Sequence, residues 1–231
     1  MDLGLGQRTI IVTGAASGIG AAIARMLAAE GVAGLLLTDR DRDGLDRIAT
    51  DLGALTSVES VVADLADSTA ATVIAEACVA RFSRIDGMVN AAGLTTRGSF
   101  TTGTADLWDT LFAVNARAGF LLMQAAIADM TRRKAPGAIV NILSMNAHCG
   151  VPELAIYASS KGAMQTLTKN AAHAHMADRI RSNGINLGWV ATEVEQRIQS
   201  ALLGEDWEEK VAATQPLGRL VTPEECARLA T

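Results

Sequence analysis

Residues 8–20 read RTIIVTGAASGIG, and this stretch decides the fold. The apolar run Arg8–Thr13 has the composition of a buried β-strand. A glycine-rich turn follows it, and a helix is expected to start at about Gly18. The segment therefore predicts a strand, a tight turn and a helix whose N-terminus offers unpaired amides to an anion.

The glycines in this turn have separate tasks. Gly14 allows the chain to turn sharply, while Gly18 and Gly20 remove side chains where a pyrophosphate approaches the backbone and where the helix packs on the strand. Ser17 and Ile19 lie between them and are expected to contact the same phosphates. A tight turn without a ligand is the alternative interpretation of this segment alone.

The rest of the chain repeats the alternation of apolar runs with segments of helical period, which is typical of βα units around a parallel sheet. The expected strands are Arg8–Thr13, Leu35–Thr38, Val58–Ala63, Ile85–Asn90, Ala138–Leu143 and Arg179–Leu187, and the expected helices are Gly18–Glu30, Asp41–Asp51, Thr69–Phe82, Ala105–Arg132 and Leu154–Met176, with further helices in Ala191–Thr231. Right-handed crossovers then predict one α/β domain over residues 1–231, a doubly wound parallel sheet with helices on both faces.

Composition excludes several classes of protein. Of the 231 residues, 49% are hydrophobic and 19% charged, which argues against disorder, and the apolar segments are interrupted before the roughly 18 residues of a membrane span. The N-terminus does not resemble a signal peptide, so a cytoplasmic protein is expected. The net charge of -5, with basic residues scattered, argues against nucleic-acid binding. Cys78, Cys149 and Cys226 are too few and too far apart for a disulfide framework or a zinc site, and they are expected to be buried or half-buried.

Asp39 ends the second expected strand, nineteen residues after Gly20. An acidic residue at this distance is placed to accept hydrogen bonds from an adenosine ribose and to repel a 2′-phosphate, so NAD is favoured. Arg40 keeps NADP open as the alternative, because a guanidinium can accept that phosphate. Asp39 could also be the cap of the helix that starts at about Asp41.

Tyr157 and Lys161 are four residues apart and share one face of the expected helix Leu154–Met176. A phenol has a pKa of about 10, and a neighbouring ammonium is expected to lower it. The pair could then act as the base in alcohol oxidation or the acid in carbonyl reduction. The spacing alone is common by chance.

Together, the TGxxxGIG turn, Asn90-Ala91-Ala92-Gly93, Asn115, Ser144 and the YxxxK pair resemble the short-chain dehydrogenase/reductase family, in order and over essentially the whole chain. The resemblance implies hydride transfer between a nicotinamide cofactor and a secondary alcohol or ketone. It implies that Ser144 binds the substrate oxygen, that Tyr157 exchanges the proton, that Lys161 also holds the nicotinamide ribose, and that Asn115 anchors a water that relays the proton.

The resemblance also implies cofactor contacts along the strand ends. Asn90 and Gly93 match the family's NNAG element, in which Ala91 replaces the second Asn, and Asp64-Leu65 matches its adenine-binding step. Val190 and Thr192 match the loop that meets the carboxamide, although Leu187 stands where Pro is usual. No metal is expected.

Substrate and assembly are less constrained by the sequence. Asn146 is a candidate substrate contact, as is His148 on the same loop, and Thr192–Lys210 has the place of the family's substrate lid. The charges of Glu193, Glu195 and Arg197 on the lid favour a sugar, a polyol or a related hydroxylated compound. Small residues on the two long helices, as at Ala125-Ala126 and Ala171-Ala172, favour a homo-oligomer, expected to be a tetramer.

Three further readings follow from the sequence. An NADPH-dependent ketone or 3-oxoacyl-thioester reductase is the alternative activity, and a catalytically silent dinucleotide sensor is the alternative without an activity. The family's usual seventh strand does not follow the helix that begins at Pro223, so we expect the chain to be incomplete, since the sixth strand would otherwise be an unprotected edge.

Overall fold

The sheet consists of six parallel strands in the order β3-β2-β1-β4-β5-β6 in the computed structural model, which describes residues 3–231. This is the order of a doubly wound dinucleotide-binding sheet, and it confirms the predicted fold class. The strands are β1 (Thr9–Thr13), β2 (Gly34–Asp39), β3 (Ser57–Val62), β4 (Gly87–Asn90), β5 (Gly137–Ser144) and β6 (Ile180–Leu187).

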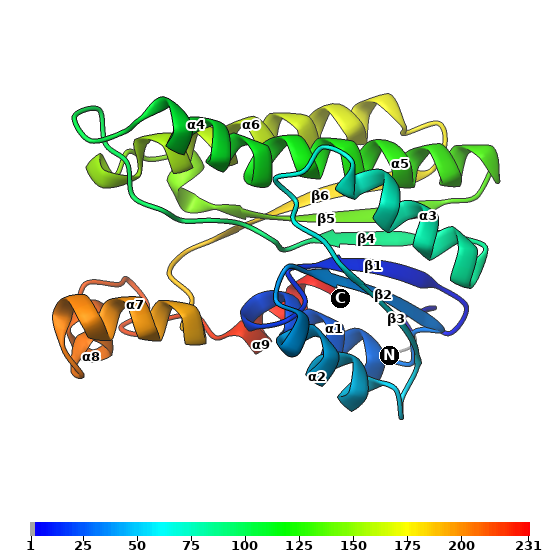
Figure 1. Cartoon of the computed structure of the whole chain (residues 1–231), viewed down its shortest axis with the longest axis horizontal. Helices are drawn as coiled ribbons and strands as arrows, with labels where there is room; N and C mark the ends of the chain where they lie inside the picture. The colour runs from blue at the N-terminus through cyan, green and yellow to red at the C-terminus, as the bar shows by residue number, and fades with distance from the viewer. Residues whose placement is uncertain (1–2) are drawn as a thin grey trace.

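Helices cover both faces of the sheet (Figure 1). The helices α1, α2 and α9 lie on one face, and α3, α4, α5 and α6 lie on the other. Their bounds are α1 (Gly18–Ala29), α2 (Arg42–Leu52), α3 (Ala70–Phe82), α4 (Ala105–Phe112), α5 (Ala118–Arg132), α6 (Ala155–Ala174) and α9 (Pro223–Ala230). Two further helices, α7 (Glu193–Leu203) and α8 (Trp207–Ala212), extend away from the sheet beyond the end of β6.

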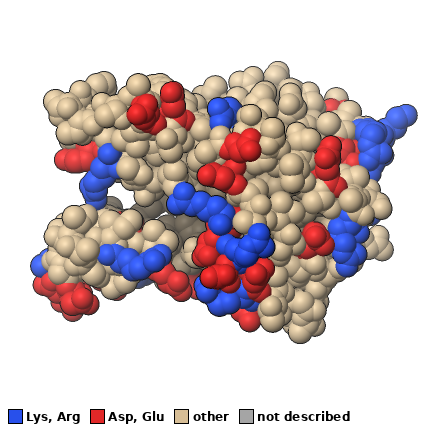
Figure 2. Space-filling model, viewed as in Figure 1, with Lys and Arg blue, Asp and Glu red and all other residues tan. Residues whose placement is uncertain are grey.

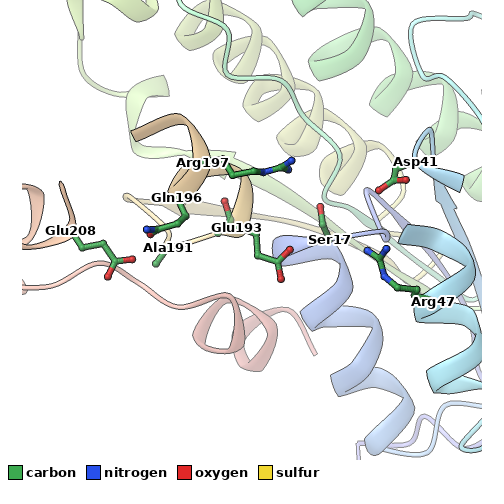
Figure 3. A pocket seen from close by; sticks show the side chains of 9 residues that line it. Ser17, Asp41, Arg47, Ala191, Glu193, Gln196, Arg197 and Glu208 are labelled. Carbon is green, nitrogen blue, oxygen red and sulfur yellow. The ribbon is translucent and has the colours of Figure 1, made fainter. Parts of the chain in front are cut away.

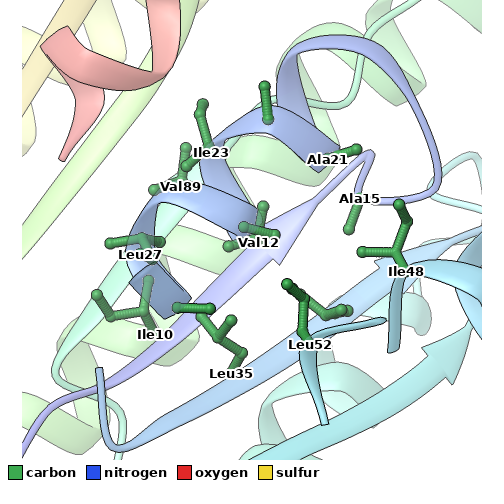
Figure 4. Close-up of a cluster of buried hydrophobic side chains, with 14 of the residues drawn as sticks. Ile10, Val12, Ala15, Ala21, Ile23, Leu27, Leu35, Ile48, Leu52 and Val89 are labelled. Carbon is green, nitrogen blue, oxygen red and sulfur yellow. The ribbon is translucent and has the colours of Figure 1, made fainter. Parts of the chain in front are cut away.

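Each face of the sheet has its own apolar core. Figure 4 shows the cluster beneath α1, where Val12 and Leu35 of the strands meet Ile23 and Leu27 of the helix. The central strand β1 is buried at every position, as its apolar centre Ile10-Ile11-Val12 predicts for a strand covered on both faces. This packing fixes the carboxyl ends of the strands, where the candidate site lies.

The expected helical stretch Ala105–Arg132 is helical throughout, but it is not regular. Between α4 and α5 the chain forms one π-helical segment, η1 (Ala113–Arg117), which contains Asn115. A π segment widens a helix by one residue per turn and is frequent at functional sites. The bounds of the helical stretch were thus predicted, while the π segment at Asn115 was not.

The same helical stretch, Ala105–Arg132, is long and apolar enough to cross a membrane by length and composition, with a mean hydropathy of 1.5. No such segment is expected from the sequence, whose apolar runs are interrupted by charged residues and glycines. In the fold, 56% of its apolar window is buried, because α5 packs against the sheet. Its apolar character therefore belongs to a core helix.

At the far edge of the sheet, β6 pairs with β5 through Leu187, which lies opposite Ser144. The residue that replaces the family's usual Pro thus continues the strand pairing. Beyond it, α8 contributes to a small core of Trp207, Val211 and Leu220, which Trp189 contacts from the loop after β6. The segment expected as a substrate lid is anchored in this apolar cluster by Trp207.

Candidate active site

The ends of β1 and β4 are joined by a network around Thr13. Its hydroxyl donates to Asn90 Oδ1 at 3.1 Å and accepts the amides of Ala91 and Ala92 at 3.1 and 3.0 Å. Thr13 is completely buried, so this network holds the segment after β4 against the glycine turn. Asn90 and Ala91 therefore shape the wall of the site through bonds to Thr13.

The glycine turn is folded as its sequence predicts. Gly14 has a φ of +67°, and a Cβ there would lie 2.9 Å from the backbone of Ala92. A Cβ on Gly20 would lie 2.1 Å from the carbonyl oxygen of Gly14, so the helix can approach the turn only without a side chain. The absence of side chains at Gly14 and Gly20 is explained by the tight turn alone, without a ligand.

Gly18 points to a ligand more directly. A Cβ at this residue, whose φ is +53°, would lie 3.3 Å from Cγ2 of Thr192, so the glycine turn and the loop after β6 face each other here. Ser17, which precedes α1, makes no side-chain capping bond. The amides of the first turn of α1 thus lack the partner that a capping side chain would give, and they are free to bind an anion.

Asp39 lies beside this turn. One carboxylate oxygen accepts the amide of Ala16 at 3.1 Å, and the other accepts the amide of Asp41 at 3.1 Å. The cap of α2 is Asp41, whose side chain accepts the amide of Gly44, so the interpretation of Asp39 as the helix cap was wrong. Each oxygen of Asp39 keeps a lone pair for a ribose hydroxyl. Arg40 is exposed.

A pocket of about 650 Å³ opens between this region and the lid (Figure 3). Arg47 of α2 and Arg197 of α7 approach Ser17 from opposite sides of it. Asp43 lies one helical turn before Arg47, and Glu193 lies one turn before Arg197. Among residues 3–231, neither guanidinium nevertheless forms an ion pair. Sequence reasoning noted Arg197 only as a charge on the expected lid and missed Arg47, since only the fold brings α7 over Ser17.

The remaining expected cofactor residues lie along the same edge of the sheet. Leu65 is buried, and Asp64 accepts the amide of Ala66 at 2.8 Å. Val190 forms an isolated parallel bridge with Val221, and Thr192 caps α7 by accepting the amide of Glu195. Gly93 lies against the catalytic candidates, because a Cβ there would be 3.2 Å from Lys161 Nζ and 3.4 Å from Asn115 Oδ1.

The π segment η1 turns the side chain of Asn115 toward α6. Its Oδ1 accepts the amide of Leu94 at 2.8 Å, and its Nδ2 donates to the Leu94 carbonyl at 2.9 Å and to Ser160 Oγ at 3.0 Å. Ser160 in turn donates to the carbonyl of Tyr157 at 2.7 Å. Asn115 therefore clamps the loop after β4 onto the helix that carries Tyr157 and Lys161.

Lys161 is buried and its ammonium donates to the carbonyl oxygen of Ile142 at 2.8 Å. Within the described chain it has no carboxylate partner. Burial lowers the pKa of Lys161 from its usual value to about 8. A buried cation without a counter-ion is costly for the fold, which is typical of a functional residue.

Tyr157 and Ser144 meet at the end of β5. Burial raises the pKa of the Tyr157 phenol, and a hydrogen bond with the Ser144 side chain opposes that shift. The charge of Glu195 raises the pKa further. The expectation that Lys161 lowers the pKa of Tyr157 is therefore wrong for the chain alone, in which burial dominates and the ammonium is bonded to Ile142.

The loop after β5 carries the two weaker substrate candidates. Asn146 is half-buried, and its amide donates to Ser144 Oγ at 3.1 Å, which orients that hydroxyl. His148 is exposed. Cys149 is exposed too, against expectation, while Cys78 and Cys226 are buried, and all three thiols are free. No group of three or more His, Cys, Asp or Glu residues in the described part of the chain could hold a metal ion.

Comparison with known proteins identifies relatives of this chain. The sequence model of the short chain dehydrogenase family matches residues 8–202. The 2-(S)-hydroxypropyl-CoM dehydrogenase 3 of Xanthobacter autotrophicus is 35% identical over 96% of this chain and 88% of its own length. The L-xylulose reductase of Bos taurus is 35% identical over 85% of this chain and 77% of its own.

A solved structure shows the same architecture. L-Sorbose reductase from Gluconobacter frateurii, complexed with NADPH and L-sorbose, superimposes with a TM-score of 0.94 at 28% identity, covering 100% of this chain and 90% of the other. The fold, the family model and these relatives agree with one another. The chain therefore belongs to the short-chain dehydrogenase family and is an NAD(P)-dependent oxidoreductase that acts on a CH–OH group.

Proposed function

We propose that Tyr157 is the residue that exchanges the proton with the substrate oxygen, and that Ser144 and Lys161 support it. The observation that carries this proposal is the burial of Lys161, a cation without a carboxylate partner in residues 3–231, four residues after a buried phenol. A bound nicotinamide supplies or accepts the hydride. The protein contributes orientation and proton chemistry.

The Ser144 hydroxyl is the proposed binding group for the substrate oxygen. It accepts the Asn146 amide and hydrogen-bonds the Tyr157 phenol, so a substrate oxygen placed between Ser144 and Tyr157 would accept its proton as charge develops. Asn146 then acts through Ser144 and lines the substrate side of the same loop.

Asn115 and Lys161 form the proposed route for the proton to solvent. One lone pair of Asn115 Oδ1 is used by the Leu94 amide, and the other is open. The missing side chain of Gly93 leaves a space flanked by Asn115 Oδ1 and Lys161 Nζ. A water in that space would link the ammonium to the exterior.

For the cofactor we propose NAD, held by the amides after Ser17, by Asp39 and by Thr192. The carboxylate of Asp39 has lone pairs for both ribose hydroxyls and repels a 2′-phosphate. NADP stays as the alternative, supported by the exposed Arg40 and by the NADPH complex of the L-sorbose reductase. Titrating both cofactors against the wild type and Asp39→Asn would separate the two.

For the substrate we propose a sugar, polyol or related hydroxylated compound. The names of two relatives, L-xylulose reductase and L-sorbose reductase, support this class. The alternative is a ketone or 3-oxoacyl thioester, which is supported by a 3-oxoacyl-[acyl-carrier-protein] reductase of Thermotoga maritima that is 30% identical over 96% of this chain.

The mechanism is tested by Tyr157→Phe. Loss of the hydroxyl should reduce turnover by about 10²–10⁴-fold, the usual contribution of a general acid or base, while the Kd for the nicotinamide cofactor changes little. Turnover is followed by the absorbance of the reduced nicotinamide, and binding by its fluorescence. Undiminished turnover in Tyr157→Phe would overturn the mechanism.

We also propose a cytoplasmic homotetramer. Apolar side chains on the α4–α5 side support an assembly, since Trp108, Phe120 and Phe100 are exposed, at 46%, 43% and 100% respectively. The small residues Ala125 and Ala171 are only partly buried and could pack against a second copy. Light scattering on the purified protein tests the assembly, and a monomeric mass would contradict the proposed tetramer. Cell fractionation tests the location.

A further inference from the structure

The lid and the start of α2 face each other across the pocket of about 650 Å³ beside Ser17. Asp41 and Arg47 line this pocket from the α2 side, and Glu193 and Arg197 line it from α7. In Figure 3 the guanidinium of Arg197 extends toward Asp41. The carboxylate of Glu193 extends toward Arg47 in the same view. Opposite charges therefore face each other in two places across one gap.

These facing side chains are exposed and not paired. None of the four is in an ion pair within residues 3–231. Each arginine has an acid one helical turn earlier, Asp43 before Arg47 and Glu193 before Arg197, in the order that favours pairing along a helix. Since neither local pair forms, both guanidinium groups are available to the opposite side of the gap.

The two helices begin at fixed points on either side of the pocket. Asp41 Oδ1 caps α2 by accepting the amide of Gly44 at 3.2 Å, and Oδ2 has no hydrogen-bond partner among residues 3–231. Thr192 caps α7 by accepting the amide of Glu195, and it already lies against the glycine turn at Gly18. A tilt of α7 about this contact would bring its charges to α2.

The charges of the pocket argue against a second anion site between α2 and α7. Carboxylates of Asp41, Glu193 and Glu208 line it, against the two guanidinium groups of Arg47 and Arg197. Figure 2 shows acidic and basic side chains gathered together over α1 and α2, next to the hollow beside the lid. A free anion would meet an excess of negative charge, whereas ion pairs between the two sides neutralise the facing charges.

We propose that the ion pairs Arg197–Asp41 and Arg47–Glu193 form across the pocket when the nicotinamide cofactor is bound, and that they hold α7 against the start of α2. The closed helix covers Ser17 and the first turn of α1, so both pairs must break before the cofactor is released. The proposal rests on the proposed cofactor site at the glycine turn. These four residues are positioning residues, which act on the rate of release through the lid.

The test measures the dissociation rate of NADH, a quantity that needs no turnover. The enzyme–NADH complex is mixed with excess NAD in a stopped-flow instrument, and the loss of bound-NADH fluorescence is followed. Arg47→Gln, Arg197→Gln, Glu193→Gln and Asp41→Asn, which keeps a helix-capping side chain, should each speed release about two- to fivefold, the usual worth of one exposed ion pair. The matched control is Arg228→Gln, at an exposed arginine on α9 outside the pocket, which should leave the rate unchanged.

The two acid variants separate ion pairing from a direct contact between the arginines and the cofactor phosphates. Glu193→Gln and Asp41→Asn each remove a negative charge beside an anionic cofactor, so repulsion alone predicts slower release. Ion pairing across the pocket predicts faster release in both. Slower or unchanged release in the two acid variants would overturn the proposal, whatever the arginine variants do.

Exchanging the charges of one pair gives the sharpest check. Arg47→Glu and Glu193→Arg should each speed release more than the neutral variants do, because each places like charges across the gap. The double variant Arg47→Glu/Glu193→Arg restores opposite charges and should release NADH at close to the wild-type rate. A double variant that releases NADH as fast as the single variants would contradict the pairing.

Salt gives a second readout that a merely structural change would not move. Raising the ionic strength from about 0.1 M to about 1 M shortens the Debye length from about 10 Å to about 3 Å. Release from the wild type should then speed up by a larger factor than release from Glu193→Gln/Arg197→Gln, which has the same net charge but neither pair. Equal salt dependence in the two proteins would count against the ion pairs.

Failure of this proposal and failure of the proposed cofactor site give different results. If Gly18→Ala binds NADH as tightly as the wild type, the glycine turn is not the cofactor site and the premise is lost. If Gly18→Ala weakens binding while the four neutral variants release NADH at the wild-type rate, the cofactor site stands and the ion pairs across the pocket are overturned.

Discussion

Among residues 3–231, buried charged side chains are paired with opposite charges at one end of the parallel sheet and unpaired at the other. At the amino ends of the strands, Asp86 and Asp129 have side chains only 1% and 6% exposed, and arginines bind both of them. Arg133 contacts both carboxylates, while Arg84 binds Asp86 at 2.8 Å. At the carboxyl ends, Lys161 is buried with a carbonyl oxygen as its partner.

The paired carboxylates at the amino ends stabilise the fold, whereas the ammonium at the carboxyl ends, unpaired within the described chain, is available for catalysis. Asp86 accepts the amide of Thr9, and Asp129 accepts the amide of Ile85, so the paired carboxylates also fix the starts of β1 and β4. Burial pushes the pKa of Asp129 up, but the hydrogen bonds from Arg133, Ile85 and Arg132 outweigh it and lower the pKa. At the other end, the shifts of Tyr157 and Lys161 are dominated by burial.

The largest effect on stability is expected at the amino end. Asp129→Ala leaves Arg133 short of one partner and the Ile85 amide unpaired, so the free energy of unfolding should fall by about 3–5 kcal/mol. The turnover number of the folded fraction should stay the same. Urea denaturation and active-site titration measure both.

Asp129→Asn, which keeps an acceptor for Ile85, should lose less stability than Asp129→Ala. Arg132→Ala, at a side chain 64% exposed, should cost under about 1 kcal/mol. If Asp129→Ala lowered turnover while the free energy of unfolding stayed unchanged, the assignment of stability to the amino ends and catalysis to the carboxyl ends would be wrong.

The next effect has the opposite sign and lies at the carboxyl end. Lys161→Met removes a buried charge, so it should stabilise the fold at pH 7 by roughly 1–3 kcal/mol, after the lost bond to Ile142 is counted, while turnover is lost. Urea denaturation of both proteins checks the sign. A less stable Lys161→Met would show that the ammonium holds the fold.

The same lysine predicts a pH dependence. Its pKa is about 8 in the folded chain and about 10.4 in the unfolded chain, so the unfolded state binds more protons between these values. Wild-type stability should therefore rise from about pH 8 to about pH 10.4 relative to Lys161→Met, because the cost of the buried charge disappears. Equal pH profiles for the two proteins would contradict this.

The smallest effect concerns the glycine turn. Gly18→Ala places a Cβ 3.3 Å from Thr192 at a φ of +53°, which should cost about 1 kcal/mol and weaken nicotinamide binding several-fold. Gly162→Ala is the control, since a Cβ there meets nothing within 4 Å and the residue is helical, so stability should rise slightly. Fluorescence titration with NADH would sharpen the comparison, and tight binding by Gly18→Ala would contradict it.

Local sequence patterns were sufficient for most of the fold. The run Thr9–Thr13, with Ile10, Ile11 and Val12 at its centre, is buried throughout because β1 is covered on both faces, and the glycines after it have few alternative conformations. Element ends were harder to place. Ile85 and Asp86 were expected in a strand, but they lie before β4 and bind Asp129 and the arginines, a set of long-range contacts that no local pattern contains.

The candidate site divides in the same way. Spacing placed Tyr157 and Lys161 on one helix face, and the structure brings both to the end of β5 with Ser144. The direction of the Tyr157 pKa shift was missed, because it depends on burial, and burial is a property of the packed chain. Arg197 was noted only as a charge on the expected lid and Arg47 was missed, because α7 meets α2 and Ser17 only after the chain folds.

The π segment at Asn115 has a consequence for the phase of the helices around it. A regular helix advances by about 100° per residue, so one residue inserted into it would rotate everything that follows by that amount, unless a π turn takes up the extra residue. Deleting one residue from Ala113–Arg117 would join α4 and α5 into a single regular helix. Leu122 and Met123 would still face the sheet, because the deletion and the return to a regular turn cancel in phase. The wall of the active site at Asn115 thus depends on a single extra residue, whereas the packing of α5 on the sheet does not.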